Sequence, residues 1–454
     1  MDSKCANLSK FNLEIYKLVF LTIIFWNLMN MKRMDIFPEN NLQKFMFIFL
    51  PFACGYFLSY LYRSTNAVLA PYLSNDLNLN AEQLGLITSA YFLTFGLFQL
   101  PLGILLDKFG ARRVQSILFL VAATGAILFS FGNNVWSLVI ARGLIGLGVS
   151  GALMGAFKAF AVWFPKDRLP LLIGLFMSAG GLGAIVASTP LEMAMQITDW
   201  RGVYLFLGII TIFIGFLIFF IVPEKKESAN NEETLPILKV LKEIYTSYTF
   251  WRIGPLSGIA GGTGLAVLGL WAGPWLADIG KFNKIEIANI LFISTIMMTI
   301  GTTSLGIITD YLRKFNISPV GVMGGALIIF IIPFTIITFG LMPKAIWPWV
   351  ILSITSLAAT LAYAGLSQHF PNSYAARAST AINLICFLMA FIAQYAIGFI
   401  MQIVEPGKQS GYSIKAYQAG FGLFLGLLII FYVIFIIMSL IEIKNRKKIT
   451  GNDV

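Results

Sequence analysis

Residues 103–113 read Gly103-Ile-Leu-Leu-Asp107-Lys108-Phe-Gly110-Ala-Arg112-Arg113 and lie between two long apolar segments. They place one acid, three bases and two glycines together in a chain that is 58% hydrophobic. Ionised side chains are costly in hydrocarbon, so this stretch is expected to form a polar turn at a membrane surface. A shorter copy, Gly306-Ile-Ile-Thr-Asp310-Tyr-Leu-Arg313-Lys314, follows at an offset of 203 residues (103 to 306). The recurrence predicts a chain built from two related halves.

The composition indicates a protein embedded in a membrane. A typical globular chain is about a quarter charged, whereas this chain of 454 residues is 12% charged and has a mean hydropathy of +0.81. Its net charge of +11 comes from bases in short segments between apolar runs, and they form no basic domain. We therefore expect the lipid bilayer, and no nucleic acid, as the surrounding partner.

Cysteine and histidine are too few for a metal site or a disulfide framework. The cysteines Cys5, Cys54 and Cys386 lack metal-ligand spacing, and the last two fall inside apolar segments, where small core residues are expected. His369 is the single histidine. The sequence also has no G-x-S-x-G elbow and no phosphate-binding P-loop. We expect no metal, no cofactor and no enzymatic activity.

Twelve apolar segments are long enough to cross a bilayer as helices, which need about 20 residues each. Helices suit this role because a spanning backbone must satisfy its own hydrogen bonds. The sequence therefore predicts an all-α membrane protein with 12 transmembrane helices. The segments comprise residues 44–71, 82–105, 112–132, 135–160, 169–191, 201–222, 250–276, 285–309, 318–341, 346–367, 376–402 and 413–441.

The longest polar stretch between these segments divides them into two groups of six. Six crossings return the chain to the same side of the membrane, so the halves repeat in parallel. Residues 18–29, near the N-terminus, are apolar but too short to span comfortably. The predicted parts are a cytoplasmic or interfacial extension, a six-helix bundle, a cytoplasmic linker, a second bundle and a basic tail, at residues 1–43, 44–223, 224–249, 250–441 and 442–454.

The distribution of Lys and Arg predicts the orientation. The two charged turns, the linker and the C-terminal tail are rich in bases and fall on one side of the predicted topology. The loops of the other side hold few, chiefly Lys281, Lys284, Lys344, Lys408 and Lys415. By the positive-inside rule, both termini are expected in the cytoplasm, with the protein in the cell membrane.

The spacing Gly-x3-Asp-[Lys/Arg]-x-Gly-x-[Arg/Lys]-[Arg/Lys] resembles the loop between helices 2 and 3 of the major facilitator superfamily. At the same offset, Ala-Pro71-Tyr-Leu matches Gly-Pro274-Trp-Leu, and the resemblance covers residues 44–441. It implies two six-helix bundles, related by an axis along the membrane normal, that rock around a central site. It also implies a protein that usually works as a monomer.

The resemblance further implies that the charged turns belong to a conformational switch. Asp107 would interact with the N-terminal end of a helix in the opposite half, where backbone N–H groups favour negative charge. Arg112 and Arg113 would pair with acids or lipid headgroups. Such contacts would stabilise one of two alternating states. The implied switch residues are Gly103, Asp107, Lys108, Gly110, Arg112, Arg113, Gly306, Asp310 and Arg313.

The first predicted helix carries a polar stripe on one face. At 100° per residue this stripe contains Tyr56, Ser59, Tyr60, Arg63 and Asn66. Ionisable groups inside a membrane are candidates for function, and a planar guanidinium suits a carboxylate or phosphate. Arg63 either lines a solute cavity or snorkels to the outer interface. The polarity of the whole stripe favours the cavity.

The fourth predicted helix contains Arg142 followed by spaced glycines, which resembles the fourth-helix motif of the superfamily. A glycine face lets two helix backbones approach closely. Residues 146–151 also match G-x-G-x-x-G, but without a surrounding βαβ unit they are not a dinucleotide site. Arg142 either faces the solute or contacts a helix end or backbone carbonyls, and the sequence leaves both readings open.

The second half offers amides and hydroxyls in place of a charge. Asn383 and Gln394 share a stripe of the eleventh predicted helix with Ser379 and Thr380, and both amides are expected to line the cavity. Threonines of the eighth helix are expected to pack between helices, since such side chains bond helix to helix for about 0.6 kcal/mol on average.

These observations predict a secondary active transporter that moves a small organic solute by alternating access. Two arginines, with no acid near the midplane of any predicted span, favour a carboxylated or otherwise anionic solute. The predicted solute-binding residues are Arg63, Tyr60, Asn66, Tyr56, Arg142, Asn383 and Gln394.

The coupling ion, a proton or sodium as in a symporter, stays open. Relatives that move organic anions often couple them to protons through acids near such an arginine, but Tyr62 precedes Arg63 here. The alternatives are an exporter, a neutral-solute carrier with a structural Arg63, and a sensor with a transporter fold that moves nothing. A sensor would need a large signalling domain, and the linker and tail are too short for one.

Overall fold

The structure is a computed structural model that describes residues 41–165, 168–223, 237–367, 369–370 and 372–450. Helices make up the regular structure of these residues, and no strand occurs among them. The predicted N-terminal extension up to residue 40, residues 224–236 of the predicted linker and the last four residues of the tail lie outside the described residues.

Two sets of helices form what we call the N-terminal half and the C-terminal half. The N-terminal half comprises α2 (Asn41–Lys44), η1 (Phe45–Phe49), α3 (Leu50–Ser64), α4 (Asn66–Leu77), α5 (Ala81–Ser130), α6 (Val135–Val149), α7 (Ala152–Trp163), α8 (Leu169–Val186), α9 (Thr189–Ala194) and α10 (Trp200–Ile221). The C-terminal half comprises α11 (Ile237–Thr246), α12 (Tyr248–Ala266), η3 (Val267–Trp271), α13 (Ala272–Asp278), α14 (Lys284–Arg313), α15 (Pro319–Phe339), α16 (Trp347–Thr355), η4 (Ala358–Thr360), α17 (Leu361–Ser367), α18 (Asn372–Val404) and α19 (Ile414–Thr450).

Each of the twelve predicted segments falls on helical residues of the structure. Within the described part of the chain, ten helices are long and apolar enough to cross a membrane, and Leu171–Val186 is a shorter apolar helix. The 50-residue α5 contains two predicted segments, which join at Gly110 with φ 79° and ψ 160°. A residue with a side chain rarely adopts this positive φ, so glycine permits the bend of the charged turn.

The first helix of each half is interrupted partway across. In the N-terminal half, α3 ends at Ser64, Thr65 is its C-cap, and α4 begins at Asn66. In the C-terminal half, the π-helical turn η3 separates α12 from α13. Interruptions inside a membrane are tolerated where protein surrounds the freed backbone groups, and the first of them follows Arg63 directly.

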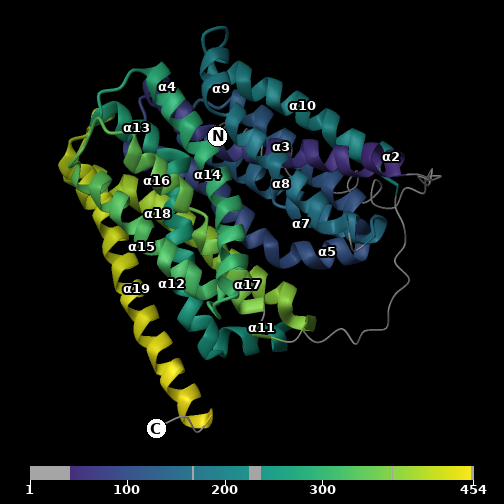
Figure 1. Cartoon of the computed structure of the whole chain (residues 1–454). Helices are drawn as coiled ribbons and strands as arrows, with labels where there is room; N and C mark the ends of the chain where they lie inside the picture. Colours follow the sequence, from purple (N-terminus) through teal and green to yellow (C-terminus); the bar gives the residue numbers. More distant parts are fainter. Residues whose placement is uncertain (1–40, 166–167, 224–236, 368, 371, 451–454) are drawn as a thin grey trace, which may run out of the picture.

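The two halves meet at one end of the molecule and diverge toward the other (Figure 1). At the closed end, α4 contacts α13 and α5 contacts α18. A Cβ added at Gly273 would lie 2.1 Å from the Ala67 carbonyl oxygen, and one at Gly398 would lie 2.2 Å from that of Ala81. Only glycine allows backbones of the two halves to approach so closely.

Polar bonds between the halves also lie at this closed end. The hydroxyl of Tyr395 donates to Glu82 over 3.1 Å, and Thr189 Oγ1 donates to Asn289 Oδ1 over 3.0 Å. The charged turns lie at the opposite end, where a Cβ added at Gly103 or Gly306 would meet no atom within 4 Å. We call this the open end.

Candidate functional site

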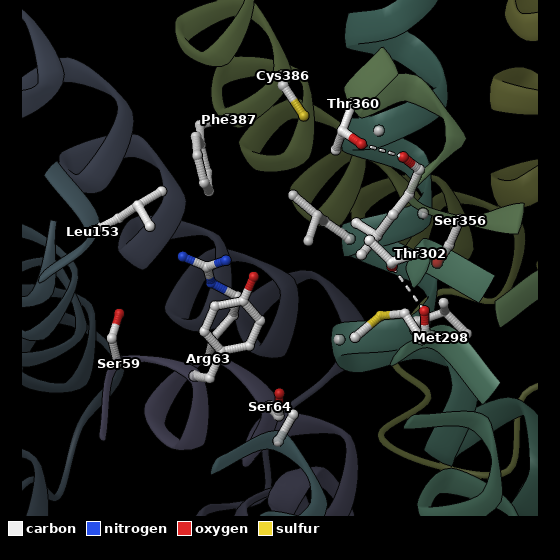
Figure 2. A pocket seen from close by; sticks show the side chains of 18 of the residues that line it. Ser59, Arg63, Ser64, Leu153, Met298, Thr302, Ser356, Thr360, Cys386 and Phe387 are labelled. Atoms are coloured by element: carbon white, nitrogen blue, oxygen red, sulfur yellow. Dashed lines mark hydrogen bonds between the residues drawn. The ribbon is translucent and has the colours of Figure 1, made fainter. Parts of the chain in front are cut away.

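A cavity of about 570 Å³ lies between the two halves. The N-terminal half contributes residues of α3, α5, α7 and α8, and the C-terminal half contributes residues of α12, α14, α16 and α18. Figure 2 shows Ser59, Arg63 and Leu153 on one side of this space and Ser356, Thr360 and Thr302 on the other. A solute in the cavity would therefore contact both halves.

Arg63 is the single charged residue among the described residues that line this cavity. Its guanidinium points into the space from α3 (Figure 2). The guanidinium carbon lies 4.7 Å from the ring centre of Tyr60, 5.0 Å from that of Phe95 and 5.3 Å from that of Phe387. Aromatic faces attract a cation without neutralising it. Arg63 thus keeps a positive charge available inside the cavity instead of extending to the outer interface.

No ion pair compensates Arg63 within the described part of the chain, and its Nε is buried without a hydrogen-bond partner. Leaving a buried charge without hydrogen-bonding partners is costly. An anion in the cavity would supply the missing partner. This is the chemistry that the site offers most directly.

Tyr56, Tyr60 and Asn383 line the same cavity as Arg63, so the structure brings together four of the seven predicted residues. The Tyr56 and Tyr60 rings meet edge to face at 5.0 Å, and the Tyr56 hydroxyl donates to the sulfur of Met177 at 3.3 Å. Asn383 Oδ1 accepts from the Tyr363 hydroxyl at 3.0 Å. This bond fixes the orientation of the amide.

Asn66 and Gln394 do not line the cavity. Asn66 is 3% exposed and lies at the edge of the predicted stripe, whose cavity face continues past Thr65 through Ala67 and Val68. Gln394 is fully buried where α5 meets α18, and its backbone carbonyl accepts from Trp271 Nε1 at 3.1 Å. The cavity-lining face of α18 ends before Gln394, because the opposite half covers the outer part of this helix.

Arg142 also lies outside the cavity lining and is fully buried. Its Nη1 donates to the backbone carbonyl of Tyr62 at 3.1 Å. The guanidinium carbon lies 5.2 Å from the ring centre of Phe129 and 5.3 Å from that of Tyr204. Of the two readings that the sequence left open, the observed contact is the one to a backbone carbonyl.

Several lining residues had not been predicted for the site. Phe387 lies one helical turn after Asn383 on α18, so helical spacing could have indicated it. Phe95 and Ser294 carry no comparable signal, because an apolar ring or a lone serine in a membrane helix is common. The Ser294 hydroxyl is buried without a partner and lines the cavity.

The threonines of the eighth predicted helix bond within their own helix. Thr295 Oγ1 donates to the carbonyl of Leu291 at 2.9 Å, and Thr302 Oγ1 donates to that of Met298 at 2.8 Å. Both residues also line the cavity. The expectation that they pack between helices therefore describes them poorly.

The first charged turn makes contacts inside the N-terminal half. Asp107 pairs with Lys158 of α7 at 2.6 Å, so the contact expected with the opposite half is not formed among the described residues. Arg112 is 5% exposed, and its Nη1 donates to the carbonyl of Val222, the C-terminal cap of α10, at 3.3 Å. Cations are favourable at such helix ends.

In the second turn, Asp310 and Arg313 line a small hollow of about 310 Å³ near the start of α15. Both side chains are exposed at the open end.

The described part of the chain thus has two halves, ten helices long and apolar enough to cross a membrane, and a cavity between the halves. The sequence profile of the Major Facilitator Superfamily matches residues 52–394. The chain belongs to this superfamily and is a multi-pass membrane protein.

Curated transporters resemble parts of the chain. An uncharacterized transporter of Bacillus subtilis, YybO, is 31% identical over 44% of this chain and 46% of its own length. The probable sulfoacetate transporter SauU of Cupriavidus necator is 29% identical over 35% of this chain and 36% of its own length. The hexuronate transporter of Bacillus subtilis is 25% identical over 62% of this chain and 67% of its own length. The chain thus spans about half or less of the length of YybO and of SauU.

A solved structure shares the fold. It is a bacterial homologue of the human lysosomal transporter Spinster, in an inward-facing and unoccupied conformation, with a TM-score of 0.71. The alignment has 16% identity and covers 88% of this chain and 97% of that one. At this identity the likeness concerns the fold alone.

Proposed function

We propose that the chain carries a small organic anion across the cell membrane by alternating access, with Arg63 binding the anionic group. The observation that carries this proposal is the uncompensated charge of Arg63 inside the cavity. A planar guanidinium forms paired hydrogen bonds with a carboxylate or sulfonate, and such charge-assisted bonds are about twice as strong as neutral ones.

The opposite wall supports a solute that also carries hydroxyl or carbonyl groups. Asn383 has its Oδ1 occupied by Tyr363, so its amide nitrogen is left to donate to a solute. Ser294 offers a buried hydroxyl without a partner. Buried polar groups favour ligands that satisfy them, so a hydroxylated acid suits both walls better than an aliphatic one.

The names of the relatives agree with an anionic solute. Sulfoacetate and hexuronates are organic anions, the first with a sulfonate and the second with a carboxylate and several hydroxyls. We extend only the chemical class to this chain.

In this proposal the open end faces the cytoplasm. The base-rich turns lie there, and the positive-inside rule assigns them to the cytoplasmic side together with both termini. The described conformation is then inward-facing. The Asp107–Lys158 pair would exchange for the predicted contact with the opposite half when the open end closes. We also propose that the two bundles comprise residues 44–223 and 250–441 and that the carrier is a monomer.

Ligand-induced thermal stabilisation of the purified full-length protein tests the proposal. The panel contains D-glucuronate, D-galacturonate, tartrate and sulfoacetate, with D-glucose and D-xylose as neutral counterparts. At about 100 times its dissociation constant, a bound ligand stabilises the folded state by about 2.7 kcal/mol. We expect at least one anion to stabilise the wild type and to lose this effect in Arg63→Ala. A neutral sugar as the only hit would instead support the neutral-solute carrier with a structural Arg63.

A further inference from the structure

Arg142 is a cation with few polar partners in the described core. Its side chain is fully buried, and its Nε and Nη2 have no hydrogen-bond partner. Its bond from Nη1 to the Tyr62 carbonyl measures 3.1 Å. Burying a charge with so few partners costs stability. An apolar side chain would fill the same space at lower cost, so the bond to the Tyr62 carbonyl is expected to have a role beyond stability.

The carbonyl of Tyr62 belongs to a buried group of bonds that we call the clamp. Thr65 Oγ1 also lies 3.1 Å from this carbonyl, and it lies 3.0 Å from the Tyr204 hydroxyl. The Tyr62 hydroxyl lies 2.9 Å from Thr211 Oγ1. The clamp therefore consists of Arg142 from α6, Tyr204 and Thr211 from α10, and Tyr62 and Thr65 from the first helix.

The clamp holds the helix interruption from its buried side. Tyr62 and Thr65 flank Arg63 and Ser64, and these two residues line the cavity. Thr65, between α3 and α4, keeps the bond from its N–H to the Leu61 carbonyl at 3.1 Å and the bond from the Leu69 N–H to its own carbonyl at 3.0 Å, and the Tyr62 carbonyl is bonded by side chains. The clamp supplies bonds from two neighbouring helices at that point.

We propose that Arg142 is a positioning residue that aims Arg63 into the cavity by fixing the carbonyl of Tyr62. The inference rests on the proposed function only in taking Arg63 as the anion anchor. Arg142 does not line the cavity, so it acts on a bound anion through the backbone of residues 62–65. This positioning role differs from the direct solute-binding role that the sequence predicted for Arg142.

The geometry explains why the clamp uses arginine. The flat guanidinium lies near the rings of Phe129 and Tyr204 while one of its nitrogens points at the carbonyl. A lysine ammonium is compact, more strongly hydrated and carried on a flexible stem, so it holds neither direction as firmly. Arg142→Lys should therefore retain only part of the function.

A test without any solute uses Cys386, which lines the cavity beside Phe387. In a Cys5→Ser/Cys54→Ser background, we would measure how fast Cys386 forms a mixed disulfide, with release of methanesulfinate, with an anionic sulfonatoethyl methanethiosulfonate and with a cationic trimethylammonioethyl methanethiosulfonate. A correctly aimed Arg63 attracts the first reagent and repels the second. The rate ratio of the two reagents then reports where the charge of Arg63 lies.

We expect Arg63→Ala to lower this ratio most, and Arg142→Gln to lower it about threefold or more, with Arg142→Lys between Arg142→Gln and the wild type. In an Arg63→Ala background, Arg142→Gln should cause no further change, because coupled residues are non-additive. An unchanged ratio in Arg142→Gln would overturn the inference. So would an equal decrease with and without Arg63.

Thr65→Val and Tyr204→Phe keep the test decisive if Arg142→Gln does not fold. Thr65→Val removes two bonds of the clamp and Tyr204→Phe removes one, both leave the arginine in place, and each should lower the ratio only when Arg63 is present. The matched control is Thr338→Val in α15, where a fully buried hydroxyl donates at 2.7 Å to its own helix at Phe334. A decrease of the same size in this control would assign the effect to general loosening.

The same variants separate this inference from the proposed function. If D-glucuronate and sulfoacetate fail to bind the wild type but the reagent ratio depends on Arg142 through Arg63, the proposed solute class fails and the clamp stands. If these anions bind and the reagent ratio is the same in Arg142→Gln as in the wild type, the clamp inference fails and the proposed function stands.

Discussion

The two halves share an architecture but contribute different chemistry to the cavity. At the offset of 203 residues that relates the charged turns (103 to 306), Arg63 corresponds to Ala266 and Tyr60 to Thr263. The first helix of each half is interrupted at the corresponding place, after Ser64 and from Val267. Among the described lining residues the charge comes from the N-terminal half alone, whereas both halves supply hydroxyls and an amide, Gln99 from the first and Asn383 from the second.

This difference separates what the repeat preserves from what it leaves free. Helix interruptions and charged turns recur because both halves must close and open as rigid units. The cavity walls need not match, because a solute has two different ends. An anionic end at Arg63 and a polar end at Asn383 would connect the halves and favour their closure.

The largest effect is expected from substitutions that force the halves apart at the closed end. A Cβ in Gly273→Ala would lie 2.1 Å from a carbonyl oxygen of the other half, and overpacking costs about 1–3 kcal/mol. The equilibrium should shift away from the inward-facing conformation by about tenfold, since each 1.4 kcal/mol is a factor of ten. The rate at which the anionic thiosulfonate modifies Cys386 from the open end should fall by a similar factor.

Gly426→Ala is the matched control, because a Cβ there would meet no atom within 4 Å. Equal rates of Cys386 modification in Gly273→Ala and Gly426→Ala would contradict the view that the close contact of Gly273 with Ala67 holds the closed end together.

An intermediate effect is expected at the polar wall of the C-terminal half. Asn383→Ala should weaken the binding of D-glucuronate by about 2- to 10-fold, the usual worth of one neutral hydrogen bond. Propionate, which has no second polar group to accept from the amide, should lose less. Calorimetric titration of both anions into wild type and variant measures the difference. Equal losses for both would mean that Asn383 does not distinguish the two ends of the solute.

A smaller effect is expected at the charged turn. Lys158→Gln frees Asp107 for the predicted contact with the opposite half, so closure of the open end should become easier and Cys386 should react more slowly. Asp107→Asn removes both contacts and should have the opposite effect. The exposed pair is worth at most about 1 kcal/mol, so changes of about fivefold or less are expected. Changes in the same direction for both variants would exclude a switch at this position.

The smallest effect is expected from a pair that lies on one half only. The Arg201 guanidinium donates to Asp76 at 2.5 Å and lowers the pKa of that carboxyl. Because the pKa of Asp76 is lower in the folded state, the pair stabilises the fold at pH values above the unfolded-state pKa of about 3.9. This stabilisation is lost as the pH falls through the folded-state pKa. Melting temperatures of the wild type and Asp76→Asn should therefore converge below about pH 4 and keep a constant difference from pH 5 to 7. A difference that grows toward acid would reverse the assigned sign.

The sequence predicted the fold well because its signals are local or repeat. Apolar length indicates a span, and the charged turn with its copy indicates two halves. Arg63, Tyr56, Tyr60 and Asn383 were found as cavity residues because helical periodicity holds along unbroken helices. Asn66 lies at the edge of the same stripe, and periodicity alone does not show that Ala67 and Val68 line the cavity there while Asn66 is buried.

The remaining residues depended on how helices from the two halves pack. Gln394 lies on the polar face of α18, but α5 covers that part of it. Phe95 meets Phe387 of the other half at 4.4 Å, and no pattern within either helix indicates such a pair. Arg142 was recognised as exceptional, but its partner is a backbone carbonyl 80 residues away, which sequence spacing cannot identify.

Uptake into proteoliposomes tests the central claim most directly. Radiolabelled D-glucuronate and sulfoacetate would be compared with D-glucose in wild type, Arg63→Lys and Arg63→Ala. We expect the wild type to take up at least one of the anions and to leave the neutral sugar outside. Arg63→Lys should retain a small fraction of this uptake, and Arg63→Ala should show none although its melting temperature without solute is unchanged. Undiminished anion uptake by a folded Arg63→Ala would contradict the account.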